Sequence, residues 1–230
     1  MRLIDRWVGI PLCFFASFWP LKKAQADSNS TLATNIPPPD TIVFILIAEI
    51  GALVVAYPAI KETRKQHPKS RICFITAPAG LQTLELMGFE KEDIFLLETS
   101  SIKSLLKGIV NIRSHFKGKR VSAIVLEPFT RFSTLLSAWI GASKRIGCYR
   151  FLNEGVYLGN ILTHRLVYNP HLHMSQTYFA LAKALIEPDS AKPLLKEYIP
   201  SQIKNRLKIN IPEKERQTLM KRLQSECPEN

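Results

Sequence analysis

The chain has 230 residues, of which 46% are hydrophobic and 22% are charged, so it can bury one sizeable core and is not compositionally disordered. Its formal net charge of +12 favours an anionic partner: a nucleic acid, a lipid headgroup surface or a phosphorylated substrate. Lysine and arginine are spread along the chain without a groove-reading or base-stacking motif, which argues against nucleic acid. The four cysteines are far apart and form no C-x-x-C pair, which predicts free thiols in a reducing compartment and no disulfide or zinc site.

Residues 1–26 combine two arginines, an apolar block over residues 7–19 and two lysines behind that block. A basic start, a short apolar block and a closing A-x-A are typical of a cleavable signal peptide, which would export the protein. Gly9 and Pro11 interrupt the block, however, and the lysine pair opposes translocation. We therefore favour a cytoplasmic protein held peripherally on the inner membrane by this segment, with export as the alternative.

The folded part is expected to begin after residues 27–40, which are polar and proline-rich and therefore predict a linker. Residues 42–48 form an apolar run typical of a strand that is buried on both faces of a parallel sheet. Gly51 then allows a tight turn or the close approach of a ligand, and residues 52–65 predict a helix. Many nucleotide-binding folds open in this way, although the G-x-G-x-x-G motif is absent here.

The rest of the chain repeats this alternation of strand and helix. Further strands are predicted at residues 71–76, 94–97, 121–126 and 145–147, and further helices at residues 81–87, 102–116, 131–140 and 174–185. The alternation predicts an α/β fold, a Rossmann-like, doubly wound parallel sheet over residues 41–186. Residues 149–173 show no regular pattern, and residues 187–230 predict a connection followed by a charged helix over residues 213–224.

In a doubly wound sheet, ligands bind outside the carboxyl ends of the strands. This rule nominates Glu49 and Gly51 after the first strand and residues 77–80 after the second. It also nominates Glu127 and Arg131, which follow the fourth strand. These positions are therefore the first candidates for a functional site.

Several ordered stretches carry a family resemblance: IAEIGALVVAYPAI, LEPFTRFSTLLSAWIGASKRIGC, EGVYLGNILTH and YNPHLH. Together, over about residues 42–185, they resemble glycosyltransferase family 9, the ADP-heptose:lipopolysaccharide heptosyltransferase family. The resemblance implies a GT-B architecture with two Rossmann-like domains, of which the N-terminal one binds the acceptor and the C-terminal one the donor. The chain would then be an acceptor-binding domain with a lead-in to a donor-binding domain that it does not contain.

The resemblance also implies a reaction. Family members transfer a sugar with inversion at the anomeric carbon and need no metal or other cofactor. The expected donor is an ADP-heptose-like nucleotide sugar, and the expected acceptor is an anionic glycolipid such as lipopolysaccharide or another cell-envelope glycan. The alternative is a non-catalytic acceptor-binding module or fragment.

One position departs from the family pattern. Family members have an aspartate, regarded as the general base, directly after the turn glycine, where this chain has Ala52. Alanine cannot accept a proton, which makes Glu49 and Glu127 the nearest candidates for the base. For Glu49 the alternative is that it caps the helix or pairs with an arginine. Gly51 and Ala52 are still expected to contact the acceptor.

Basic side chains are expected to bind the anionic part of the acceptor. Arg131, Lys144, Arg145 and Arg150 are predicted to surround the carboxyl edge, where arginine offers two parallel hydrogen-bond donors to a phosphate or carboxylate. A solvated charge on the surface is the alternative for Lys144.

Three histidines fall in or next to the stretch without a regular pattern. His164 and His171 are predicted to contact the acceptor, and His173 forms a His-x-His pair with His171. No carboxylate or cysteine has a suitable spacing to these rings, so no metal site is predicted.

Overall fold

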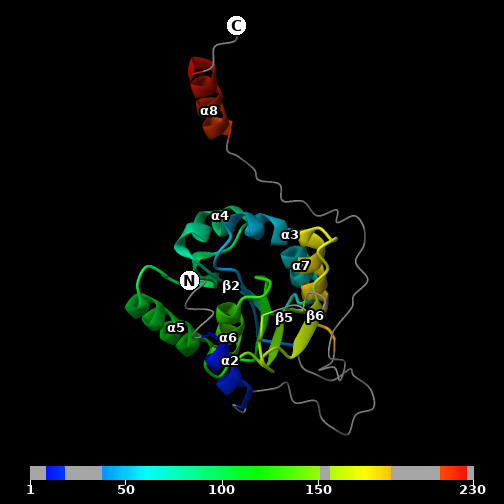
Figure 1. Ribbon diagram of the computed structural model, residues 1–230. Helices are drawn as coiled ribbons and strands as arrows, with labels where there is room; N and C mark the ends of the chain where they lie inside the picture. Colours follow the sequence, from blue (N-terminus) through cyan, green and yellow to red (C-terminus); the bar gives the residue numbers. More distant parts are fainter. Residues whose placement is uncertain (1–8, 19–37, 151–155, 188–212, 227–230) are drawn as a thin grey trace.

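A computed structural model describes residues 9–18, 38–150, 156–187 and 213–226 (Figure 1). Six parallel strands form one sheet in the order β3-β2-β1-β4-β5-β6. The strands are β1 (Thr41–Ile45), β2 (Arg71–Thr76), β3 (Ile94–Leu96), β4 (Val121–Val125), β5 (Lys144–Arg150) and β6 (His164–Val167). The helices are α2 (Gly9–Phe18), α3 (Ile50–Gln66), α4 (Leu81–Leu86), α5 (Ile102–Phe116), α6 (Arg131–Trp139), α7 (Met174–Lys183) and α8 (Glu213–Glu226), with short 3₁₀ helices η1 (Pro78–Gly80) and η2 (Lys91–Asp93).

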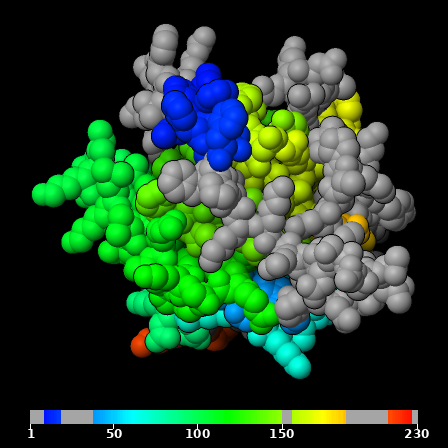
Figure 2. Space-filling model, turned by 90° about the horizontal axis from the view of Figure 1, so that it is seen from below, coloured from blue at the N-terminus to red at the C-terminus, as the bar shows by residue number. Residues whose placement is uncertain are grey.

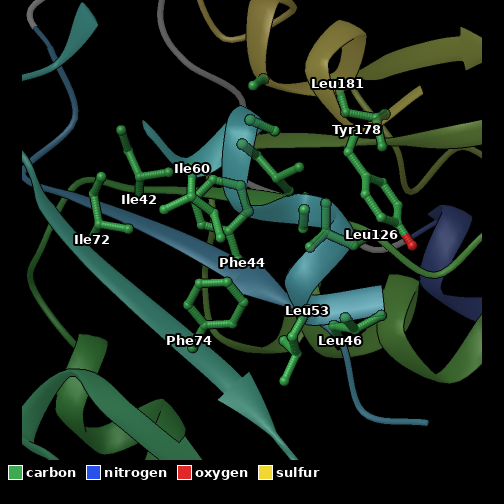
Figure 3. Packing of buried hydrophobic residues seen from close by; sticks show 14 of the residues in the cluster. Ile42, Phe44, Leu46, Leu53, Ile60, Ile72, Phe74, Leu126, Tyr178 and Leu181 are labelled. Carbon is green, nitrogen blue, oxygen red and sulfur yellow. The ribbon is translucent and has the colours of Figure 1, made fainter. Parts of the chain in front are cut away.

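Helices cover both faces of the sheet, which explains why the central strand β1 is buried along its whole length. On one face Ile42 and Phe44 belong to a core that includes residues of α3, α4 and α7. On the other face Val43 and Ile45 belong to a core with α5 and α6. Figure 3 shows the first of these cores, in which Phe44 stacks on Phe74 at 5.2 Å between ring centroids. The predicted Rossmann-like, doubly wound parallel sheet is confirmed.

Local sequence signals explain several element ends. The hydroxyl of Ser101 accepts a hydrogen bond from the amide of Ser104 at 3.1 Å, so Ser101 caps α5 as its residue type predicts. Gly88 has φ of +80°, a left-handed conformation that glycine adopts at little cost after a helix. Both helix ends therefore follow from the residue types at these positions.

Several boundaries, and one additional strand, differ from the sequence-based expectations. Strand β1 ends at Ile45 and α3 begins at Ile50, which leaves residues 46–49 as a connection. The expected irregular stretch contains β6, in which buried His164 and Leu166 alternate with half-buried neighbours. Four residues give too short an alternation to be recognised in the sequence.

The N-terminal helix α2 packs against α6 and lies at the surface of the molecule (Figures 1 and 2). Gly9 and Pro11 do not interrupt it as expected, because both lie within the described helix Gly9–Phe18. The Ser17 hydroxyl accepts a hydrogen bond from the Asn160 amide at 3.0 Å and donates to the Cys13 carbonyl at 2.7 Å. Within the described ranges, no helix is both long and apolar enough to cross a membrane.

The cysteines agree with the predicted free thiols where the structure describes them. Cys13, Cys73 and Cys148 are buried and form no disulfide with one another, and Cys227 lies outside the described residues. Burial raises the pKa of the Cys73 and Cys148 thiols to about 12. These two side chains therefore stay protonated and unreactive at neutral pH.

Candidate functional site

The strand order reverses direction next to β1, which pairs with β2 on one side and with β4 on the other. Such a reversal opens a crevice at the carboxyl ends of the two strands, where ligands of doubly wound sheets bind. Glu49 follows β1 and Glu127 follows β4, so both predicted carboxylates lie at this switch point. The candidate functional site is therefore the carboxyl edge around β1 and β4.

The Glu127 side chain is buried at this edge and accepts hydrogen bonds from three donors outside β4. One carboxylate oxygen, Oε1, accepts hydrogen bonds from the amides of Ile47 at 2.9 Å and Ala48 at 2.6 Å. The other, Oε2, accepts a hydrogen bond from the hydroxyl of Ser133 in α6. Glu127 thus joins the end of β4 to the backbone that leaves β1. Sequence reasoning missed Ser133, because a serine two residues into a helix carries no signal of its own.

Glu49 has the opposite environment. It stands at the N-cap position of α3 with extended backbone, but its side chain makes no capping hydrogen bond. The residue is exposed, and within the described residues its carboxylate has no ion pair. The capping and pairing alternatives therefore receive no support from the structure, and the carboxylate is accessible at the N-terminal end of α3.

Tyr178 of α7 brings a phenol close to both carboxylates. Burial raises the pKa of Tyr178, and the negative charges of Glu49 and Glu127 raise it further. The side chain is almost entirely buried, and Figure 3 shows its hydroxyl turned away from the apolar core, at the same end of the sheet as Leu46 and Leu126. A neutral phenol here is a hydrogen-bond donor. This donor is not evident from the sequence, because Tyr178 falls among the apolar positions of α7.

Gly51 and Ala52, the second and third residues of α3, have different surroundings. Gly51 is exposed, and a Cβ added to it would meet no atom within 4 Å, so the helix start has open space beside it. Gly51 lies in the first turn of α3 and not in the tight turn we expected. Ala52 is buried in the core that α3 shares with β1. Its methyl group faces that core and offers little surface to an acceptor.

The turn after β4 is strained. Phe129 has φ of +60°, which is rare for a bulky residue and costs about 1–3 kcal/mol. Its ring packs edge-on against Tyr168, which follows β6, at 5.3 Å between centroids. Such conformations persist where the surroundings hold them, often at functional sites, so this turn supports the location of the candidate site.

Arg131 is half-buried at the first position of α6, beside the same turn. Its Nε donates a hydrogen bond to the Tyr157 carbonyl at 3.1 Å. Its place at the carboxyl edge agrees with the prediction, while the contact with Tyr157 ties it to the segment that precedes β6.

Lys144, Arg145 and His164 lie at the opposite edge of the sheet. Lys144 and Arg145 begin β5 and His164 begins β6, so the expected position at the carboxyl edge is wrong for the two cations. Strand β5 runs from Lys144 to Arg150, and the expected strand at residues 145–147 also began at Arg145, so the two cations were assigned to the wrong end of their own strand.

The side chains at this amino edge bind backbone. Arg145 donates to the carbonyl of Ile161 at 2.6 Å and to that of Ala142. Lys144 donates to the carbonyls of Leu185 at 2.8 Å and Glu187 at 2.6 Å. The buried ring of His164 lies between the Thr163 hydroxyl, at 2.8 Å, and the Glu187 carbonyl, at 3.1 Å. A fully buried ring has no surface with which to contact a sugar.

The remaining predicted residues follow strands that end at the carboxyl edge. Arg150 is the last residue of β5, and its side chain falls outside the described part of the chain. His171 follows β6 and is exposed. His173 caps α7, where its ring accepts a hydrogen bond from the Ser175 amide at 3.2 Å. His171 therefore keeps a free face toward solvent, whereas His173 is used by its own helix.

No group of three or more histidine, cysteine, aspartate or glutamate side chains suited to a metal ion occurs among the residues that the structure describes. An open cavity of about 540 Å³ lies between β3 and α5. It contains none of the predicted site residues, and its lining is mainly apolar. We therefore place the candidate site at the switch point, where the polar groups converge, and not in this cavity.

The architecture is that of a glycosyltransferase-like α/β fold and matches one half of GT-B enzymes. A glycosyl transferase family 9 protein from Veillonella parvula superposes with a TM-score of 0.54 at 16% identity, over 84% of this chain and 52% of that protein. The E. coli heptosyltransferase WaaC, solved with ADP-2-deoxy-2-fluoro heptose, gives a TM-score of 0.51 at 10% identity, over 66% of this chain and 50% of WaaC. No protein-family model and no curated protein matches the chain.

These similarities agree with the resemblance seen in the sequence motifs, and at such identities they show the fold. The chain spans about half the length of each of the two neighbours.

Proposed function

We propose that the chain is the acceptor-binding half of an inverting glycosyltransferase of the family 9 type. The donor is a nucleotide-diphosphate sugar of the ADP-heptose kind, and the acceptor is an anionic lipopolysaccharide or another cell-envelope glycan. The observation that carries the proposal is the exposed, uncommitted carboxylate of Glu49 at the switch point of a glycosyltransferase-like fold. The similarity of WaaC, solved with an ADP-heptose analogue, supports the choice of donor class.

In this proposal Glu49 takes the proton from the acceptor hydroxyl. The hydroxyl oxygen then forms the new bond to the anomeric carbon, and the bond from that carbon to the nucleoside diphosphate breaks with inversion. A positioned general base typically contributes about 10²- to 10⁴-fold to such a step. Arg131, Arg150 and His171 are proposed to bind the acceptor, with the arginines facing its anionic groups.

The test separates binding from chemistry. Binding of deacylated lipopolysaccharide core to the chain is measured by calorimetry, and ADP release from ADP-heptose is measured with the chain joined to a donor-binding half. Glu49→Gln should lower kcat at least about 100-fold with little change in acceptor affinity. Arg131→Ala should weaken acceptor binding and make the remaining binding less dependent on salt concentration. Turnover of Glu49→Gln at the parental rate would exclude Glu49 as the base.

A non-catalytic acceptor-binding module is the second candidate. The burial of Ala52 in the core, at the position where family members have their aspartate, favours it. The test combines the chain with a donor-binding half that is active with another acceptor domain. If the chain binds the acceptor but no ADP is released, it is a non-catalytic binding module.

We also propose that α2 holds the protein peripherally on the cytoplasmic face of the inner membrane. Its inner side packs through Cys13 and Ser17, while Phe14, Phe15 and Phe18 are exposed by 49%, 68% and 74%. A helix that is apolar all round needs a cover on its outer side. The basic residues that flank it in sequence, Arg6 and Lys22 among them, match an anionic lipid surface.

Vesicle sedimentation tests this second proposal. Deletion of residues 1–26 and the double variant Phe15→Asp/Phe18→Asp should both lose binding to vesicles that contain anionic lipid. Val110→Asp is a matched control, since Val110 is exposed by 57% on α5 and far from α2 in sequence. Recovery of a mature protein that begins at Asp27 outside the cytoplasm would instead support the signal peptide.

A further inference from the structure

The segment between β1 and α3 is held by its amide groups, one after another. The amide of Leu46 donates to the Ile75 carbonyl of β2 at 3.0 Å. The next two amides, those of Ile47 and Ala48, donate to the Glu127 carboxylate. Glu49 is the first residue after this series. The direction in which its side chain leaves the sheet is therefore set by the amides that precede it.

The hydrogen bonds of Glu127 also decide what this carboxylate can do. Three donors converge on its two oxygens, from Ile47, Ala48 and Ser133. The side chain is only 7% exposed. Oε2 keeps one further lone pair, but burial leaves an acceptor hydroxyl little access to it. Removal of the carboxylate would leave two amide groups and a buried hydroxyl without their partner, at about 1–3 kcal/mol for each group that stays unsatisfied.

The turn that carries Glu127 is itself fixed from a second side. Phe129, two residues later, keeps its left-handed backbone while its ring packs on Tyr168 beyond β6. Ser133 is fully buried in α6. The carboxylate thus links β1, β4 and α6, and it reaches across a sequence separation of 80 residues to Ile47.

We propose that Glu127 is a positioning residue and not the catalytic base: its carboxylate fixes the backbone of Ile47 and Ala48 and thereby aims Glu49 into the switch-point crevice. The inference rests on the proposed function for the role of Glu49. It assigns different tasks to two carboxylates that the sequence alone could not tell apart. Ser133 assists by holding the second oxygen of Glu127.

The first test needs no activity. Amide NMR of the whole chain follows the signals of Ile47 and Ala48, with the Leu46 amide as an internal reference because it donates to Ile75. In Glu127→Ala, which leaves both amides without their acceptor, exchange of both amides with solvent should be about tenfold faster or more, whereas exchange at Leu46 stays unchanged.

Matched variants complete this test. Ser133→Ala should speed exchange at Ile47 and Ala48 by a smaller factor. Ser137→Ala, which removes another buried hydroxyl one turn later in α6, should leave both amides unchanged. Glu49→Gln should also leave them unchanged. Unaltered exchange of both amides in Glu127→Ala would overturn the proposal.

The second test uses the transfer assay. Glu127→Gln should raise KM for the acceptor with a modest effect on kcat, whereas Glu49→Gln should lower kcat. If Glu127→Gln lowers kcat as much as Glu49→Gln does while both amides stay protected from exchange, Glu127 is the base and the inference is wrong. If the parent transfers no sugar, the proposed function fails, while the amide measurements still decide whether Glu127 positions the segment before Glu49.

Discussion

At the amino edge of the sheet, Lys144 and Arg145 are buried and donate to backbone carbonyls, whereas at the carboxyl edge Glu49 is exposed and holds no partner within the described residues. The hydrogen bonds of the fold match the charges of Lys144 and Arg145 and, at the carboxyl edge, that of Glu127, whereas the charge of Glu49 stays unmatched within the described residues. A buried charge must be matched by donors or acceptors, so its removal affects stability, whereas an exposed, uncommitted charge is available to a ligand.

The largest effect is expected at Arg145. Arg145→Ala removes hydrogen bonds to the Ile161, Ala142 and Ser143 carbonyls at a residue that is 1% exposed. We expect the free energy of unfolding to fall by about 3–5 kcal/mol, measured from denaturant unfolding curves. Arg113→Ala is the control, because Arg113 also donates to a backbone carbonyl, that of Trp139, but is exposed, and it should cost less than about 1 kcal/mol. Equal losses in both variants would contradict the contrast.

A smaller effect is expected at Lys144. Lys144→Met keeps most of the apolar stem and removes the two donations to the end of α7, at Leu185 and Glu187. We expect a loss of about 2 kcal/mol and faster hydrogen exchange at residues 184–187. Lys183→Met, in the last turn of the same helix, should change exchange there much less. Unchanged exchange in Lys144→Met would show that these contacts do not hold the helix end.

The amino edge should also respond to pH. Burial lowers the pKa of His67 below its ordinary value of 6.5, and the charge of Lys144 lowers it further. The unfolded chain therefore binds the proton first as pH falls, so the free energy of unfolding is fully retained above pH 6.5 and declines below it, down to the folded-state pKa. Denaturation at pH 7, 6 and 5 measures the decline. The decline in the free energy of unfolding should be shallower in His67→Asn. His115 accounts for a further part of the decline, because burial also lowers the pKa of that side chain.

The smallest effect on stability is expected at Glu49. Because this carboxylate is exposed and makes no capping hydrogen bond, Glu49→Gln should change the free energy of unfolding by less than about 0.5 kcal/mol. Thermal unfolding measures the change. A loss comparable to that of Lys144→Met would place Glu49 among the structural charges and would remove the difference between the two edges.

The sequence by itself determined the alternation of strands and helices, and with it the Rossmann-like, doubly wound parallel sheet. It also determined local signals such as the Ser101 cap and the left-handed Gly88, because these depend on residues next to one another in the chain. It further placed Glu49 and Glu127 at strand ends, since a strand end is marked by the loss of an apolar run.

Only the tertiary structure decided which charges are buried. The hydrogen bonds from the Ile47 amide to Glu127 and from Lys144 to the Leu185 carbonyl join residues 80 and 41 positions apart, so they depend on the order of the strands. The same holds for the short strand β6, whose four residues are fixed by pairing with β5. A charged residue at the first position of a strand and one at the last look alike in sequence, but parallel pairing carries them to opposite edges of the sheet. This physical separation makes Lys144 and Arg145 structural and leaves Glu49 accessible.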